Sequence, residues 1–175
     1  MKTRFFISML ILSMSMFAAC GGGVQDTPVQ STAAILTLST AVSGTISSST
    51  AITSYDVTVI LPAGVTARST TRPPLTDAGV VTAIGSAAGS LVTAVYSAPT
   101  STRGGMVKIY IVSAGGFSAG AFSAVNCDIA AGADPKPSNF EPATLDDATG
   151  FDSTSSSTVL DLEYQLSLTS TVVIR

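Results

Sequence analysis

The chain has 175 residues, of which eight are basic and eleven acidic, and it contains no histidine. The acidic balance argues against a nucleic-acid-binding protein, which needs a basic surface, and the lack of histidine excludes Ser-His-Asp and Cys-His catalysis and the usual zinc ligand sets. Serine, threonine, alanine, valine and glycine dominate the sequence, which is typical of an extracytoplasmic β domain and not of a disordered chain.

Residues 1–19 have the pattern of a secretory signal peptide. Lys2 and Arg4 precede an apolar run that is broken by serines and is shorter than the roughly 20 apolar residues of a membrane-spanning helix. The stretch Phe17-Ala18-Ala19-Cys20 then resembles the lipobox of bacterial lipoproteins, with Phe17 where leucine is usual. The resemblance implies that Cys20 carries the lipid and becomes the mature N-terminus; the alternative is an ordinary signal peptide with Cys20 as a free thiol.

Lipid attachment at Cys20 predicts a location in the cell envelope. Each buried methylene group contributes about 0.8 kcal/mol, so several acyl chains hold a domain on a membrane. Gly21 follows the cysteine and resembles lipoproteins that are sorted to the outer membrane. Without Lys2 and Arg4, six basic residues remain against eleven acidic ones, so the mature chain has a net charge of −5. We therefore expect a membrane partner through the lipid and no nucleic-acid partner.

Residues 20–31 predict a flexible tether, since three glycines and Pro28 disfavour regular structure. Residues 32–175 predict a single domain in which apolar and polar residues alternate with a period of two. Glycine- and proline-rich links are expected at residues 68–79, 85–89 and 130–150. The predicted strands are residues 34–39, 42–47, 55–61, 80–84, 91–96, 106–113, 121–129 and 158–175. This spacing predicts an all-β jelly-roll or immunoglobulin-like sandwich of about nine strands.

The alternation also predicts which side chains face the core, because a register slip of one residue would turn them all to water. We expect Cys127 in the core as a small apolar side chain, Lys108 on the outside, and Phe122 on the outer face with Ala124 and Asn126. The expected core residues are Tyr55, Val57, Val59, Val107, Ile109, Ile111, Val125, Leu160, Leu162, Tyr164, Leu166 and Leu168.

Two stretches carry a family pattern. MVKIYIVS, from Met106, is an isoleucine-rich strand, and GGFSAGAFSAVNCDI, ending at Ile129, is a small-residue turn followed by an alternating strand. YDVTVILPAGVTA, from Tyr55, looks like a strand pair around a Pro-Gly turn. Together they resemble cohesin modules and related carbohydrate-binding modules over residues 31–175. The resemblance implies a nine-stranded jelly roll that binds a dockerin module through one sheet face, and it identifies no interface residue.

The acidic residues offer two candidate sites. Asp146, Asp147 and Asp152 are candidate calcium ligands, although Leu145 would occupy the first position of an EF-hand loop. The alternative is an acidic turn in which Gly150 has a positive φ. Asp161 and Glu163 are expected on one strand face, where a pair of carboxylates could meet the spacing of a glycosidase. A solvated strand face is the favoured interpretation, because it explains the pair with nothing added and no cleft signal accompanies it. Calcium is the one cofactor left open.

The sequence therefore predicts a non-enzymatic interaction or surface-assembly module, since a Ser-Lys dyad needs a buried lysine and Lys108 is expected outside. Its expected partner is a dockerin-like protein or an envelope component that binds one polar sheet face. The outward-facing residues expected to supply such a face are Asp56 with Thr58, Lys108 with Tyr110, and Asp161 with Glu163 and Gln165. One alternative is carbohydrate binding, for which Tyr96 and Tyr110 are the candidates because the chain has no tryptophan. Another is a subunit of a surface fibre that pairs through its last strand.

Overall fold

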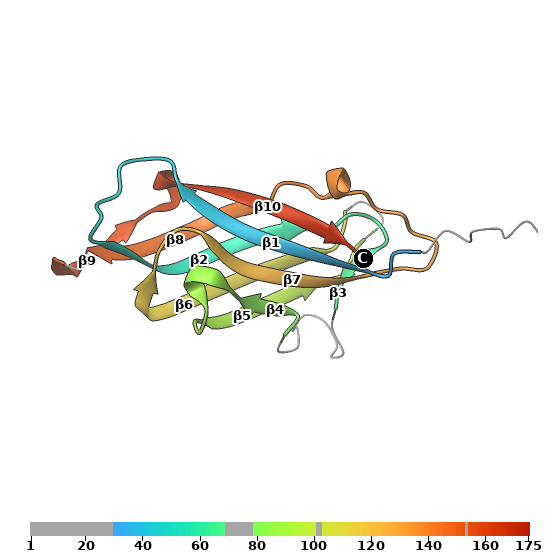
Figure 1. Ribbon diagram of the computed structural model, residues 1–175, viewed down its shortest axis with the longest axis horizontal. Coiled ribbons are helices and arrows are strands. Elements are labelled where there is room, and N and C mark those ends of the chain that lie inside the picture. Colours follow the sequence, from blue (N-terminus) through green and yellow to red (C-terminus); the bar gives the residue numbers. More distant parts are fainter. Residues whose placement is uncertain (1–29, 69–78, 101–102, 153) are drawn as a thin grey trace, which may run out of the picture.

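The computed structural model describes residues 30–68, 79–100, 103–152 and 154–175, without the side chains of 155–158. The signal peptide, Cys20, most of the tether and residues 69–78 of the expected loop lie outside these ranges. The described part is all-β, with ten strands where about nine were expected. Two antiparallel sheets pack face to face (Figure 1), so the predicted β-sandwich is confirmed.

The two sheets have five strands each. Sheet A has the order β10-β1-β7-β3, and β4 pairs with β7 beside β3. Its strands are β1 (Ala33–Val42), β3 (Val65–Ala67), β4 (Val81–Ala83), β7 (Ala121–Ile129) and β10 (Leu166–Ile174). Sheet B has the order β5-β6-β2-β8-β9. Its strands are β2 (Thr50–Ile60), β5 (Leu91–Ser97), β6 (Met106–Phe117), β8 (Thr144–Asp152) and β9 (Ser155–Asp161).

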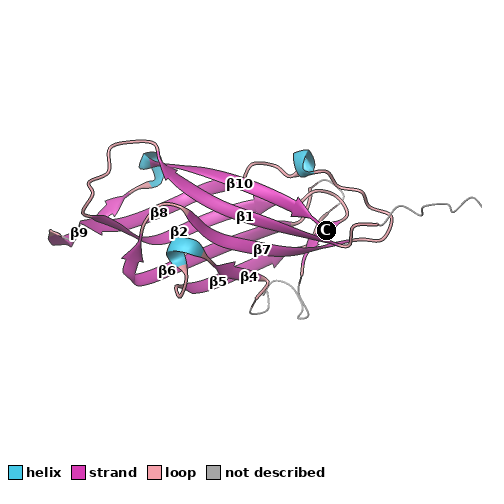
Figure 2. Ribbon diagram, viewed as in Figure 1, coloured by secondary structure: helices cyan, strands magenta, loops and turns pink. Residues whose placement is uncertain are grey.

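Short 3₁₀ helices are the helical elements of the described ranges, and Figure 2 shows them in cyan. They are η1 (Gly85–Ala87), η2 (Pro137–Asn139) and η3 (Glu163–Gln165). Within the same ranges, no helix has the length and apolar character needed to cross a membrane.

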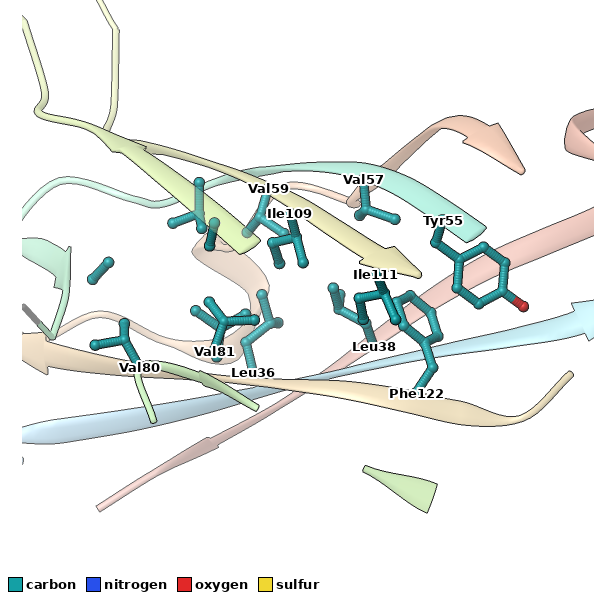
Figure 3. Packing of buried hydrophobic residues seen from close by; sticks show 14 of the residues in the cluster. Leu36, Leu38, Tyr55, Val57, Val59, Val80, Val81, Ile109, Ile111 and Phe122 are labelled. Atoms are coloured by element: carbon teal, nitrogen blue, oxygen red, sulfur yellow. The ribbon is translucent and has the colours of Figure 1, made fainter. Parts of the chain in front are cut away.

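The core lies between the sheets, where side chains from β1 and β7 meet side chains from β2 and β6 (Figure 3). Burying one valine- to phenylalanine-sized side chain contributes about 1.5–3 kcal/mol. The period-two prediction is confirmed over most of these strands. The expected core residues Tyr55, Val57, Val59, Val107, Ile109, Ile111, Val125, Cys127, Leu162 and Leu166 are buried, and Leu160 and Leu168 are partly buried.

The prediction of a strand over residues 42–47 is wrong. Val42 is the last residue of β1, and the chain then forms a loop. The N–H groups of Ser43 and Gly44 donate to the carbonyl of Gln165 at 2.9 and 3.1 Å. The loop passes so close to η3 that a Cβ on Gly44 would lie 2.6 Å from Oε1 of Gln165, so the backbone is held by η3 and not by a neighbouring strand.

The prediction of an irregular stretch up to Gly150 is also wrong, because β8 begins at Thr144 and lies inside sheet B between β2 and β9. Two register shifts, next to Ser54 and next to Asp56, interrupt its pairing with β2. At the second shift the extra residue lies on β8 and moves the apolar–polar pattern of this strand out of phase, so the sequence shows no simple alternation there. Gly150 is a strand residue and is absent from the glycines with positive φ.

The last predicted strand, residues 158–175, is two strands in different sheets. Between them, the N–H of Leu162 donates to the carbonyl of Ala148 at 2.8 Å, and the N–H of Glu163 donates to Oδ1 of Asp161 at 3.1 Å. These bonds hold η3, which carries the chain from sheet B to sheet A. Tyr164 is 82% exposed and not part of the core, and Asp161 and Glu163 do not share a strand face.

Phe122 is buried, although alternation places it outside with Ala124. Leu38 lies opposite Ser123 and Ser39 lies opposite Ala121, so Phe122 is the extra residue of a β-bulge. The bulge turns its ring inward, 4.5 Å from the ring centroid of Tyr55 on the other sheet.

Candidate functional site

The outer face of sheet B brings charged, aromatic and aliphatic side chains together. In the strand register, Tyr110 of β6 lies opposite Asp56 of β2, and Asp56 lies opposite Asp147 of β8. In the neighbouring row, Lys108 lies opposite Thr58. Residues directly opposite in a sheet have neighbouring side chains, so residues far apart in the chain form one surface.

A β-bulge gives this face two adjacent carboxylates. Asp147 pairs with Asp56, but the next pair joins Leu145 to Val57, so Asp146 is the extra residue. Leu145 packs against the core and Ala148 is buried. Asp146 and Asp147, between these two inward-facing residues, are both exposed on the outer face.

The amino group of Lys108 is the centre of the polar part of the face. Its Nζ lies 3.2 Å from Oδ2 of Asp56 and 3.8 Å from Oδ2 of Asp146. The hydroxyl of Thr58 donates to the same Oδ2 of Asp146 at 2.5 Å. We call Lys108, Asp56, Thr58, Asp146 and Asp147 the Lys108 cluster. One ammonium and three carboxylates give it a formal charge of −2.

The Lys108 cluster has more negative than positive charge, so it favours the approach of a further cation. Burial raises the pKa of Asp56 above its usual value; Lys108 opposes this effect, and repulsion from Asp146 and Asp147 adds to it. The hydrogen bond to Asp56 raises the pKa of Lys108, so the ammonium is stable. Oδ1 of Asp56 is buried without a hydrogen-bond partner among the described residues. A cationic group from a partner would therefore be favoured beside this cluster.

Apolar side chains lie next to the cluster on the β5–β6 side of the face. Leu91 is 71% exposed, Val112 is 50% exposed and Tyr110 is 37% exposed. Leu91 and Val112 are register partners, and Tyr110 follows on the same face of β6. We call Leu91, Tyr110 and Val112 the apolar strip. The sequence alternation that places Tyr110 outside applies equally to Val112, two residues further on, but the exposure of Leu91 depends on which sheet face remains uncovered.

The three candidate calcium ligands do not come together. Asp146 and Asp147 belong to the Lys108 cluster, whereas Asp152 lies five residues further along β8, roughly 16 Å away at the strand rise. Oδ1 of Asp152 accepts hydrogen bonds from the N–H and hydroxyl of Thr154 at 2.9 and 2.7 Å. These bonds lower its pKa, so Asp152 stabilises the β8–β9 turn.

The two candidate sugar-binding tyrosines have different positions. Tyr96 is 5% exposed and its hydroxyl has no hydrogen-bond partner in the described part, so the prediction that it is exposed is wrong. It reaches over Gly105, where a Cβ would lie 3.1 Å from its ring. Tyr110 is exposed as predicted, but Nζ of Lys108 lies 5.4 Å from its ring centroid, so one ring face is already engaged.

Cys127 is fully buried in β7 as a free cysteine, between Val125 and Ile129 on the core face. Burial raises the pKa of its thiol to about 12. At neutral pH the thiolate, which is the reactive form, is therefore scarcely populated.

Comparison with known proteins gives no relative for this chain. No family model, no curated protein and no solved structure matches it. The function is therefore argued from the outer face of sheet B itself.

Proposed function

We propose that this chain is a non-enzymatic, lipid-anchored protein of the bacterial cell envelope, with a cohesin-like sandwich that acts as a protein-interaction or surface-assembly module. The observation that supports this proposal is the outer face of sheet B, where the apolar strip lies directly beside the Lys108 cluster. Protein interfaces typically combine an apolar, aromatic-rich centre with polar groups at the rim. The face offers the same combination on rigid strands.

The size of the face fits such a role. Five strands at about 4.8 Å spacing, with an average length of about 30 Å, cover on the order of 700 Å², close to the roughly 800 Å² that each partner buries in a standard interface. The charge of the Lys108 cluster specifies the partner further. The partner presents an apolar side chain to Leu91, Tyr110 and Val112, with a lysine or arginine beside it for Asp146 and Asp147.

Carbohydrate binding is the weaker alternative. A flat sugar-binding platform needs exposed aromatic rings, and the structure buries Tyr96 and places Lys108 near the ring of Tyr110. Tyr164 is exposed, but it lies on η3 at the end of the sandwich where the chain passes from β9 to β10 (Figure 1). These rings do not form one platform.

The test is a capture experiment with the tagged full-length chain, using envelope extract and insoluble polysaccharide as competing baits. We expect recovery of a defined protein, which falls at least several-fold with Tyr110→Ala and with the double change Asp146→Asn, Asp147→Asn. The matched control is Asp128→Asn, which removes a half-exposed carboxylate paired with Arg68 on sheet A. Equal loss with the control, or retention on polysaccharide alone, would overturn the proposal.

A further inference from the structure

β10 is an edge strand, and among the described residues its one strand partner is β1. Ala33 and Arg175 exchange both backbone hydrogen bonds, and the N–H of Ser43 donates to the carbonyl of Gln165. The ladder has no register shift, so odd-numbered residues use their backbone groups toward β1. The even-numbered residues direct N–H and C=O groups to the free edge. These residues are Leu166, Leu168, Ser170, Val172 and Ile174.

The sequence of this edge strand lacks the features that usually protect an edge against pairing. Sheet edges are commonly blunted by charged side chains, proline or short length. β10 has nine residues, LSLTSTVVI, without a charge or a proline. The opposite edge of sheet A consists of β3 and β4, which have three residues each and offer little to pair with. An edge as long and neutral as β10 is a template for another strand.

A groove of about 650 Å³ accompanies the edge. One wall is residues 168–172 of β10, and the other is Phe140, Pro142 and Ala143 with Pro137 of η2. Figure 1 shows η2 beside the C-terminal half of β10. Leu168 and Val172 are partly buried against the core, so the groove lies on the core side of the strand. An added strand would point alternate side chains into it.

We propose that the occupant of this edge is β10 of a second copy of the chain, in an antiparallel pair with a two-fold axis at Ser170. In this register Ser170 lies opposite Ser170, Leu168 opposite Val172 and Leu166 opposite Ile174. All of them have free outward backbone groups, so each pair can exchange two hydrogen bonds. The apolar partners also lie on the groove side, where they fill the space beside Phe140.

Charge supports a second copy as the occupant. The same register brings Arg175 of one copy opposite Gln165 of the other, two residues from Glu163. The symmetry repeats this contact at the other end of the pair, so each arginine lies near the η3 turn that carries Glu163 in the other copy. A two-fold contact is closed, so the product is a dimer and not the fibre that the sequence offered as an alternative. The outer face of sheet B stays free in each copy.

Cysteine cross-linking of the full-length chain tests this register. Directly opposed residues in a hydrogen-bonded pair have Cα atoms about 5.5 Å apart, within the range of a disulfide. Ser170→Cys should therefore form a disulfide-linked dimer. The matched control Ser167→Cys lies opposite Val173, roughly 20 Å from its own copy. We expect about tenfold more disulfide-linked dimer from Ser170→Cys than from the control or from the wild type. The wild type shows how much linkage arises from Cys20 or Cys127.

A mass measurement in detergent gives an independent readout. The wild type and Ser167→Lys should sediment as dimers. Ser170→Lys places two ammonium groups at the two-fold axis, so this variant should sediment as a monomer. Its circular dichroism spectrum should remain that of the folded β protein. A monomeric wild type, whether or not it binds another extended peptide, would overturn the inference. Equal cross-linking at positions 167 and 170 would do the same.

Discussion

The hydroxyl groups of Tyr55 and Thr40 lie 2.6 Å apart inside the core and join the two sheets, because Tyr55 belongs to β2 and Thr40 to β1. The ring of Tyr55 also packs at 5.1 Å from Phe117 and 4.5 Å from Phe122, measured between centroids. Tyr55 therefore combines aromatic packing with a buried hydrogen bond at one point between the sheets.

Tyr55→Phe should destabilise the fold by about 1–3 kcal/mol, because the hydroxyl of Thr40 remains buried without its partner. Thr40→Val together with Tyr55→Phe removes both polar groups and should recover most of this loss. Urea unfolding of the wild type, both single variants and the double variant measures the coupling. Strictly additive effects would show that the hydrogen bond is not formed.

Stability should fall at alkaline pH. Burial raises the pKa of Tyr55 to about 12 from 10.0. Between these two values the unfolded chain loses its proton first, so the stabilising effect is complete below pH 10 and is lost as pH rises to 12. The two-unit difference corresponds to roughly 2–3 kcal/mol.

A comparison with Tyr55→Phe isolates the contribution of Tyr55 to the loss of stability at alkaline pH. The raised pKa of Cys127 also lowers the stability from about pH 9 upward, but Cys127 is present in both proteins. Unfolding free energies measured at several pH values should decline more steeply for the wild type than for the variant. Parallel curves would contradict the assignment to Tyr55.

Gly150→Ala should destabilise the protein by about 1–3 kcal/mol through overpacking. A Cβ at this position would lie 2.5 Å from the carbonyl oxygen of Ala51 and 2.6 Å from Cδ1 of Leu162. Gly115→Ala is the matched control in another strand of sheet B, where a Cβ meets nothing within 4 Å. Thermal unfolding should separate the two variants, and equal melting temperatures would contradict the close packing at Gly150.

Cys127 should react with an alkylating reagent far more slowly in the native protein than in urea, since its thiol is buried and its pKa is raised. Peptide mapping by mass spectrometry distinguishes it from Cys20. Cys127→Ala should cost about 1–2 kcal/mol as a small cavity. Labelling at the rate of an exposed thiol would show that the core opens at β7.

Regular strands could be predicted from the sequence because their side chains obey a period of two. For example, the alternation of Val57 and Val59 in β2, and of Ile109 and Ile111 in β6, correctly predicts which side of each strand faces the core. Two of the failures share a physical cause, which is a bulge or a turn that shifts this phase. The bulge at Phe122 buries a residue that alternation places outside, and the turn at Glu163 divides one apparent strand between two sheets.

The candidate site shows the same limit. Asp56 with Thr58, and Lys108 with Tyr110, could be assigned to outward faces from the sequence, and the pairing of β2 with β6 joins them on one face. Asp146 and Asp147 could not, because β8 joins this face by pairing with β2, whose Asp56 lies about 90 positions before its register partner Asp147, and through a bulge that no local pattern marks. The exposure of Leu91 follows from sheet order, which local alternation does not determine.

The last prediction concerns the anchor. On the proposed lipidation, Cys20→Ser should release the protein from the membrane fraction or block its processing, because the acyl chains would have no other attachment point. Cys127→Ser is the matched control, since it changes the other cysteine of the chain inside the folded core. Fractionation of cells and mass measurement of the mature N-terminus follow both variants. Membrane retention of a normally cleaved Cys20→Ser protein would contradict lipidation, and loss of the control from membranes would point to misfolding as the cause.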